Sequence, residues 1–402
     1  MRRRSRPCPT LPFCTVPPSH RTTLLTVVLA VAVLALYPLQ VLLTQVSAFR
    51  ELVNVRYDAR KILDVPWFRT SQWAWFWASI IYSYGSNFSD PQRRSLIYGW
   101  AGAPELLSYI DLLTLMMYSS LLIFFVLTLK SPYYRYQVSQ LAWTIAAIVV
   151  IVVQVHSFCN NVLNGLFWFL FPTSLVICND SMAYFAGMAF GKRWIKRPLI
   201  GELSPNKTWE GFIGAAICTL GFAFVTPRLY VKMPFLICPC ERLEVFGFNT
   251  LQLTCRYPSV FVERAYMLPQ PIASVAAAVG LSAADGSVSL LPIQLHALLL
   301  GTFASLVAPF GGFFASGIKR AFKLDDFGTW VPGHGGVFDR VDCQLIMGFA
   351  THTYYATFLS GGPYSVGALL SLSLAMSDED KLYLHTELTK ALKEKGIIGG
   401  FF

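Results

Sequence analysis

Long apolar stretches separated by short polar segments cover most of the chain. Apolar runs of about helix length occur at 22–43, 106–129, 136–158, 162–178, 211–225, 294–314, 343–359 and 363–376. A helix needs roughly 20 apolar residues to cross a bilayer, so the chain has room for roughly seven to ten crossings. The pattern therefore predicts an all-α, polytopic helical membrane protein, with lipid covering much of its surface.

Two further stretches have a less definite pattern. Residues 73–84 read WAWFWASIIYSY, and this run is short for a crossing. Its density of Trp and Tyr is typical of the membrane interface or of a short re-entrant helix. Residues 271–291 are weakly apolar and rich in small residues, and the sequence leaves open whether they form a span or a loop.

The polar ends of the chain differ from its middle. Residues 1–21 hold five arginines and five prolines, which predicts a basic arm on the cytosolic side. Residues 22–376 are expected to form one integral-membrane domain, beginning with an anchor helix. Residues 377–402 have leucines at helical spacing between Lys and Glu, which predicts a soluble amphipathic helix. The arginine-rich start leaves a mitochondrial presequence open, although its prolines disfavour an amphipathic helix.

The composition narrows the class of protein. Hydrophobic residues make up 54% of the chain and charged residues only 13%, whereas soluble domains carry roughly 25% charged residues. A disordered chain, a coiled coil and an ordinary cytosolic globule are therefore excluded. The net charge of +10 indicates either Lys- and Arg-rich cytosolic loops or a site that handles anions. The nine cysteines show no paired framework, and we expect them to be reduced on the cytosolic side.

A first polar block, residues 179–211, follows an apolar run. Asp180 lies directly at the end of that run, where an isolated carboxylate would be costly. Further on, Ser204 and Pro205 precede Lys207-Thr-Trp-Glu-Gly, a sequence typical of a helix start. The free N–H groups of such a start, with the Lys207 ammonium, favour an anion. The alternative is a cytosolic turn with a helix cap.

A second polar block, residues 316–342, begins with cations at helical spacing. Ser316, Lys319 and Arg320 are three and four positions apart, which places a hydroxyl and two cations near one helical face. The block continues into the sequence PGHGG at 332–336, where glycines allow the backbone to approach a ligand closely.

The same block ends in two carboxylates. Asp339 and Asp342 are three residues apart and can point toward one hard cation such as Mg²⁺. Carboxylates for a metal, cations for phosphate and a glycine-rich loop are the groups that phosphoryl or nucleotidyl transfer requires. The two blocks therefore predict a catalytic site on the cytosolic side. In the alternative interpretation, the two carboxylates only neutralise Lys319 and Arg320 across a turn.

These motifs resemble a known family. The spacing SxxKRx₅D followed by PGHGGxxDRxD is similar to the signature of CDP-diacylglycerol synthases, also called phosphatidate cytidylyltransferases. The eukaryotic branch is most similar, through FGGFFASGIKRAFK, FWFLFP followed by CND, SPNKTWEGFIG and PWFRT. The resemblance extends from about residue 66 to residue 350.

The resemblance implies an integral membrane enzyme that joins CTP and phosphatidate to give CDP-diacylglycerol and pyrophosphate, with Mg²⁺ as cofactor. Its metal-binding carboxylates correspond to Asp339 and Asp342, and its signature serine to Ser316. Bacterial members carry another Asp where this chain has Gly312, so Asp180 is the candidate that completes the metal shell. The chain also has Asp325 and Asn206 where most eukaryotic members have lysine.

The candidate residues fall into three groups. The catalytic candidates are Ser316, Lys319, Asp339 and Asp342; the phosphate- or substrate-binding candidates are Ser204, Lys207, Lys319, Arg320, His334, Gly335, Gly336 and Arg340; and the metal-binding candidates are Asp180, Asp339 and Asp342. His334 and Arg340 are the weaker members of the second group.

Two other classes of function also fit many spans and buried cations. One is a transporter or channel for a phosphorylated metabolite, and the other is a CTP-dependent lipid kinase, which transfers the γ-phosphoryl group. The expected partners are CTP, phosphatidate and membrane lipid, without nucleic acid, while the oligomeric state, a homo-oligomer included, stays open. The expected location is the endoplasmic reticulum membrane, with the mitochondrial inner membrane as the alternative.

Overall fold

The computed structural model describes residues 37–56, 67–89, 109–201, 203–238, 255, 257–267, 287–328, 335–360, 370, 373 and 376–394. Helices dominate these residues, and the strands form only two short hairpins among them. The prediction of an all-α fold is confirmed.

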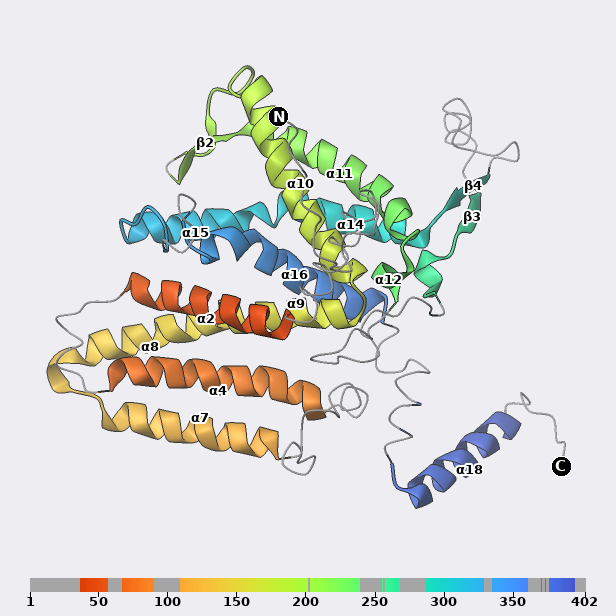
Figure 1. The fold of residues 1–402 in the computed structure, drawn as a ribbon, viewed down its shortest axis with the longest axis horizontal. Helices are drawn as coiled ribbons and strands as arrows, with labels where there is room; N and C mark the ends of the chain where they lie inside the picture. Colours follow the sequence, from red (N-terminus) through yellow and green to blue (C-terminus); the bar gives the residue numbers. More distant parts are fainter. Residues whose placement is uncertain are drawn as a thin grey trace, which may run out of the picture.

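The first group of helices lies side by side in the lower half of Figure 1. It consists of α2 (Tyr37–Val55), α4 (Phe68–Ser89), α7 (Ile110–Leu127) and α8 (Tyr134–Ile148), the last preceded by the 3-10 turn η2 (Ser131–Tyr133). A π-helical turn, η3 (Val149–Val153), continues α8 into α9 (Gln154–Leu163). Buried side chains such as Phe49, Phe76 and Ile151 pack these helices around one apolar core.

The second group packs around another core, in the upper half of Figure 1. Its helices are α10 (Phe167–Phe190), α11 (Trp209–Tyr230), the short α12 (Pro234–Ile237), α14 (Pro292–Leu306) and α16 (Phe338–Phe358). Helix α15 (Pro309–Ala321) follows α14, and its buried Ala315 belongs to the first core. The buried side chains Phe338 and Leu345 of α16 belong to the first core, while Met347 belongs to the second. Helix α16 therefore joins the two groups.

Four helical segments are long and apolar enough to cross a membrane: Ile110–Leu127, Ser131–Leu163, Trp209–Tyr230 and Pro292–Ala321. Many of their large apolar side chains are exposed, as a lipid-facing surface requires. The protein is thus an integral membrane protein. The amphipathic C-terminal helix predicted from the sequence corresponds to α18 (Asp378–Glu394), which has no buried residue.

The structure adds detail to two sequence interpretations in the first group. Residues 22–36 of the predicted anchor helix lie outside the described residues, while α2 runs from Tyr37 to Val55 and so continues beyond residue 43 into polar sequence that holds Glu51. The aromatic run 73–84 lies inside the 22-residue helix α4. Trp75 and Phe76 are only 6% and 0% exposed, so part of this run packs inside the protein. The aromatic rings pack against each other and against α2, which the local pattern did not reveal.

The second group carries both hairpins. Strand β1 (Pro198–Ile200) pairs with β2 (Ser204–Thr208) between α10 and α11. Strand β3 (Arg264–Met267) pairs with β4 (Ser287–Leu290) at the other end of α11, after the 3-10 turn η5 (Ser259–Phe261).

A disulfide joins Cys238 to Cys255 near the second hairpin, so the expectation that all cysteines are reduced is wrong. The two residues are 17 positions apart in a polar loop, and no local spacing rule identifies such a pair.

Helices α10 and α11 approach each other closely through small residues. A Cβ added to Gly211 would lie 2.9 Å from the Ala183 carbonyl oxygen and 3.2 Å from the Gly187 Cα. Backbone atoms cannot move aside as a flexible side chain can, so this position requires glycine. The contact fixes the spacing between Asp180 on α10 and the β2 strand that leads into α11.

We therefore expect Gly211→Ala to lower the activity that the sequence resemblance implies by more than tenfold, because the added methyl group separates α10 from α11. Gly221→Ala on the same helix is the matched control, since a Cβ there meets nothing within 4 Å. It should keep full activity and melt slightly higher, because alanine favours a helix over glycine. Turnover and melting temperature of both purified variants test this, and equal activity in the two would contradict the role of the close contact.

Candidate active site

The β1–β2 hairpin places Lys207 beside helix α15. The Lys207 ammonium nitrogen lies 4.6 Å from the centre of the Phe313 ring, a cation–π contact. Thr208 ends the strand and begins α11, because its hydroxyl accepts a hydrogen bond from the Gly211 N–H at 3.2 Å. The helix start that the sequence indicated at Ser204-Pro205 lies further along the chain, because Ser204–Thr208 form strand β2 and α11 begins at Trp209.

Asp180 lies on α10 close enough to Lys207 for their charges to interact. Asp180 is accessible from outside the protein, yet the protein atoms around it displace enough water to raise the pKa of its carboxyl. The Lys207 ammonium opposes this rise. One carboxylate on α10 and one cation on β2 therefore share the same electrostatic environment.

Asp342 adds a second carboxylate to this environment. It lies in the second turn of α16, and its Oδ1 accepts a hydrogen bond from the Cys343 N–H at 2.7 Å. Burial raises the pKa of the Asp342 carboxyl, and the negative charges of Asp339 and Asp180 add to that effect. A Cβ on Gly312 of α15 would lie 3.5 Å from Asp342 Oδ2. An aspartate at position 312 would thus place a further carboxylate next to Asp342.

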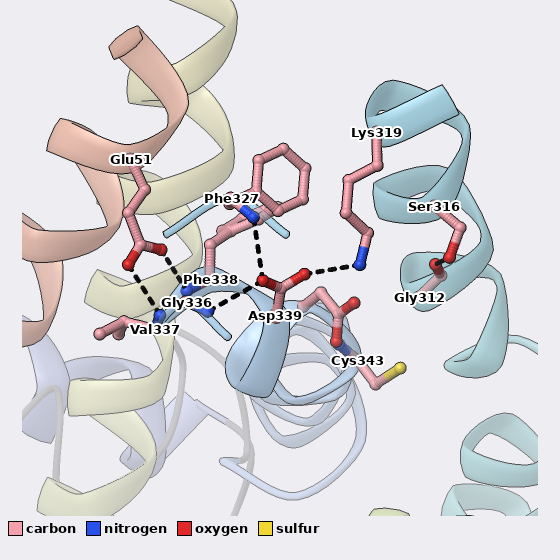
Figure 2. Close-up of polar contacts among 11 residues, drawn as sticks. Glu51, Gly312, Ser316, Lys319, Phe327, Gly336, Val337, Phe338, Asp339 and Cys343 are labelled. Atoms are coloured by element: carbon pink, nitrogen blue, oxygen red, sulfur yellow. Dashed lines mark hydrogen bonds and ion pairs between the residues drawn. The ribbon is translucent and has the colours of Figure 1, made fainter. Parts of the chain in front are cut away.

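Unlike Asp342, Asp339 uses both of its carboxylate oxygens in hydrogen bonds that connect two segments of the chain. The Lys319 ammonium donates a hydrogen bond to Asp339 Oδ1 at 2.8 Å and forms an ion pair with this carboxylate. Its Oδ2 accepts from the N–H groups of Phe327 and Gly336, each at 3.1 Å (Figure 2). The carboxylate therefore ties α15 and the loop before α16 together, and its ion pair with Lys319 is the neutralisation that the alternative interpretation of the sequence described.

Glu51 reaches this loop from α2. Its two carboxylate oxygens accept hydrogen bonds from the N–H groups of Val337 and Phe338, each at 2.9 Å, at the start of α16 (Figure 2). The side chain is only 5% exposed. A carboxylate at a helix N-terminus satisfies free N–H groups and interacts favourably with the helix dipole. Glu51 thus connects the first helix group to the site.

The structure thus brings together a pair of carboxylates with Lys207, next to a second network around Asp339. The sequence model of the cytidylyltransferase family matches residues 20–358 of this chain. The chain belongs to the cytidylyltransferase family.

Curated relatives from several eukaryotes agree with this membership. "Phosphatidate cytidylyltransferase 1" of Rattus norvegicus is 38% identical over 361 residues, covering 90% of this chain and 74% of the relative. "Probable phosphatidate cytidylyltransferase" of Dictyostelium discoideum is 38% identical over 358 residues, covering 88% and 72%. "Phosphatidate cytidylyltransferase 1" of Arabidopsis thaliana is 36% identical over 359 residues, covering 88% and 81%. The resemblance to the eukaryotic branch is confirmed.

The remaining candidates of this cytidylyltransferase lie on α15, on β2 and on α16, or outside the described residues. Ser316 is half-buried on α15, and its hydroxyl donates to the Gly312 carbonyl at 2.8 Å. Ser204 begins β2 and pairs with Ile200. Arg320 and Arg340 are exposed, and His334 lies outside the described residues.

Each of the two candidate glycines lies beside a carboxylate. A Cβ on Gly336 would lie 2.6 Å from Glu51 Oε2, and one on Gly335 would lie 2.9 Å from the Asp326 Cγ. Gly335 also has a φ of +85°, in the left-handed region that favours glycine. The sequence predicted that these glycines let the backbone approach a ligand closely. In the structure, the groups that come close to the two glycines are carboxylates of the protein itself.

Glu51 is the main residue that sequence reasoning missed. It stands among the apolar residues Ala48, Phe49, Leu52 and Val53, all less than 5% exposed. A single carboxylate inside such a run is a signal, because an unpaired buried charge is costly. The sequence analysis did not identify Glu51 as a buried carboxylate, because the anchor helix was predicted to end before residue 51.

The carboxylates fit a magnesium ion of the kind that substrate phosphates help to bind. Within the described part of the chain, no three His, Cys, Asp or Glu side chains form a group that could hold a metal. Magnesium in nucleotide-transfer sites is commonly held by one or two carboxylates together with phosphates and water. Asp342 and Asp180 supply such oxygen donors, whereas both oxygens of Asp339 already accept hydrogen bonds.

Proposed function

We propose that this chain is a phosphatidate cytidylyltransferase that converts CTP and phosphatidate into CDP-diacylglycerol and pyrophosphate. Membership of the cytidylyltransferase family and the names of the relatives support the reaction class. The observation that carries the proposal is that the charge of Asp180 interacts both with Lys207 and with Asp342, and these three residues come from three separate elements. Two carboxylates and a cation at one place match the needs of two polyanionic substrates.

The reaction is an in-line displacement. An oxygen of the phosphatidate phosphate attacks the α-phosphorus of CTP and forms a new P–O bond. The bond between the α-phosphorus and the bridging oxygen breaks, and pyrophosphate leaves with that electron pair. The nucleophile is already an anion, so no strong base is needed, and the main obstacle is repulsion between the two substrates.

The residues of the chain reduce this repulsion and fix the geometry. Lys207 is exposed on its β-strand and is available to neutralise a phosphate. Lys319 is paired with Asp339, so we assign it first to holding the loop before α16 and only then to contacting phosphate. We propose that Asp342 and Asp180 bind Mg²⁺, which when bound neutralises the triphosphate and withdraws charge toward the leaving pyrophosphate.

The position of a label in the product tests the reaction. Detergent-purified protein is supplied with phosphatidate, Mg²⁺ and CTP labelled at the α- or the γ-phosphorus. Transfer of the α-label to the lipid fraction, with unlabelled lipid from γ-labelled CTP, is expected for the cytidylyltransferase. Transfer of the γ-label would instead show a lipid kinase. No transfer by a folded protein would contradict both.

We further propose that the protein resides in the endoplasmic reticulum membrane with its site facing the cytosol. Lys207 precedes the N-terminus of the membrane-spanning helix α11, while the Cys238–Cys255 disulfide follows its C-terminus. A helix of 22 residues is about 33 Å long, enough to place the two on opposite sides of a bilayer. Disulfides persist in oxidising compartments such as the lumen of the endoplasmic reticulum.

This topology predicts which thiols react with a maleimide. In microsomes dissolved in denaturant, Cys238 and Cys255 should become reactive only after reduction, which adds two labels per chain to the gel shift. Cys238→Ser should abolish this reduction-dependent step. Cys218→Ser is the control, since Cys218 is a free exposed thiol, and it should remove one label both before and after reduction. Labelling of Cys238 without reduction would contradict the lumenal assignment.

A further inference from the structure

A basic turn connects α10 to strand β1, and the site described above does not use it. The turn, residues 192–197, reads Lys-Arg-Trp-Ile-Lys-Arg, and all six side chains are exposed. No acidic residue occurs in the sequence between Asp180 and Glu202. Four cations therefore lie together in a segment that carries no negative charge of its own.

The turn has a defined shape that does not depend on its cations. The carboxylate of Glu210, at the start of α11, accepts hydrogen bonds from the N–H groups of Trp194 and Ile195 at 3.0 and 2.8 Å. Glu210 is only 7% exposed. Lys192 adopts a left-handed backbone with a φ of 62°, which reverses the chain after α10. A buried carboxylate thus holds the turn in place from the neighbouring helix.

Aromatic side chains stand beside the cations. The indole of Trp194 is 76% exposed and stacks on the ring of Phe190, with ring centres 6.1 Å apart. The Arg193 guanidinium lies 5.7 Å from the centre of the Phe190 ring. An exposed indole and an exposed Ile195 next to four cations form an amphipathic surface.

The surface lies at the same end of α10 and α11 as the candidate site. Strand β1 begins directly after the turn, and Pro198 pairs with Thr208, the residue after Lys207. Figure 1 shows the hairpin beside the end of α10. Any phosphate held by the turn is therefore held on the face of the membrane where Lys207 lies.

We propose that residues 192–197 bind the phosphate headgroups of anionic lipids and so concentrate phosphatidate at the site. This inference rests on the proposed function only in naming phosphatidate as the lipid that is consumed. Trp is the residue that best suits the membrane interface, and clustered Lys and Arg attract anionic headgroups. A soluble nucleotide is the less fitting ligand, because the N–H groups of Trp194 and Ile195 already bond to Glu210 and the side chains lie on an open surface.

The test compares two sets of four charge removals in the full chain. The first variant changes Lys192, Arg193, Lys196 and Arg197 to Gln. The matched control changes Lys232, Lys381, Lys390 and Lys393 to Gln, none of which lies near the turn in the sequence. Each protein is reconstituted into phosphatidylcholine nanodiscs with a minor fraction of phosphatidate, and the apparent KM is measured separately for phosphatidate and for CTP.

The first variant should show an apparent KM for phosphatidate raised roughly tenfold, with the KM for CTP and kcat unchanged. The control variant should behave as wild type. High salt should weaken phosphatidate use by the wild type and have little effect on the first variant, because screened charges no longer attract. An unchanged KM for phosphatidate would overturn the proposal, and so would a rise in the KM for CTP instead, which would assign the turn to the nucleotide.

A binding measurement separates this proposal from the proposed function. The fluorescence anisotropy of a dye-labelled phosphatidate is followed in neutral detergent, with dye-labelled phosphatidylcholine as the reference lipid. The first variant and Trp194→Ala should bind the labelled phosphatidate more weakly than the control variant does. If the wild type transfers no label from CTP, the proposed function fails, and this binding difference still decides the role of the turn.

Discussion

Replacing Asp342 with asparagine is expected to lower kcat by about a thousandfold, the largest effect of any single change at the site. Asparagine keeps the size of the side chain and one oxygen, but it removes the negative charge that we assign to binding Mg²⁺. Asp342 is half-buried and close to the charges of Asp339 and Asp180. The measurement is the rate of label transfer from α-labelled CTP to phosphatidate at saturating substrates.

The stability of the same variant separates a functional role from a structural one. Removing one of several like charges relieves repulsion, so Asp342→Asn should melt no lower than the wild type. Asp378→Asn is the matched control, because Asp378 is exposed on α18 and pairs only with Lys381 among the described contacts. The control should keep full activity. Near-full activity of Asp342→Asn at the usual Mg²⁺ concentration would contradict the metal assignment.

Asp339→Asn should behave differently from Asp342→Asn. Asp339 holds the Lys319 ammonium and two backbone N–H groups, so its loss disconnects α15 from the loop before α16. We expect a lower melting temperature together with lower activity, because buried donors lose a charged acceptor. A variant with wild-type stability and lost activity would instead return Asp339 to the metal-binding group.

The sequence predicted the membrane helices and the polar blocks because both are local signals. A run of apolar residues long enough to cross a bilayer forms a helix in lipid. Helices α7, α11 and the α14–α15 segment correspond to apolar runs that the sequence showed. The motifs around Lys207 and Asp342 were likewise identified from composition and spacing. The patterns indicated a helix start close to Lys207 and an apolar run over 343–359, while the helices themselves begin at Trp209 and at Phe338.

The partners of these residues could not be predicted, because they come from distant segments. The carboxylate of Glu51 contacts Val337 and Phe338, 286 and 287 residues away. Cys238 and Cys255 pair across a polar loop without a characteristic spacing. Each case depends on how the helices pack, which no local pattern encodes.

The second large effect is expected for Glu51→Gln. Glutamine offers one acceptor oxygen, and its amide N–H₂ faces a backbone N–H of Val337 or Phe338 that needs an acceptor. Leaving one buried N–H without an acceptor costs about 1–3 kcal/mol, so the melting temperature should fall. Because these groups start α16, the helix that carries Asp339 and Asp342, we also expect kcat to fall more than tenfold.

Two further variants show whether Glu51 positions the site or only stabilises the fold. Glu379→Gln, on the exposed helix α18, is the matched control and should change neither property. Gly328→Ala should act like Glu51→Gln, because its Cβ would lie 2.5 Å from Glu51 Oε1 and displace the carboxylate. Activity is measured well below the melting temperature of every variant, so that only folded protein is compared. If Glu51→Gln then matched the wild type in kcat while melting lower, the carboxylate would stabilise α16 without positioning its aspartates.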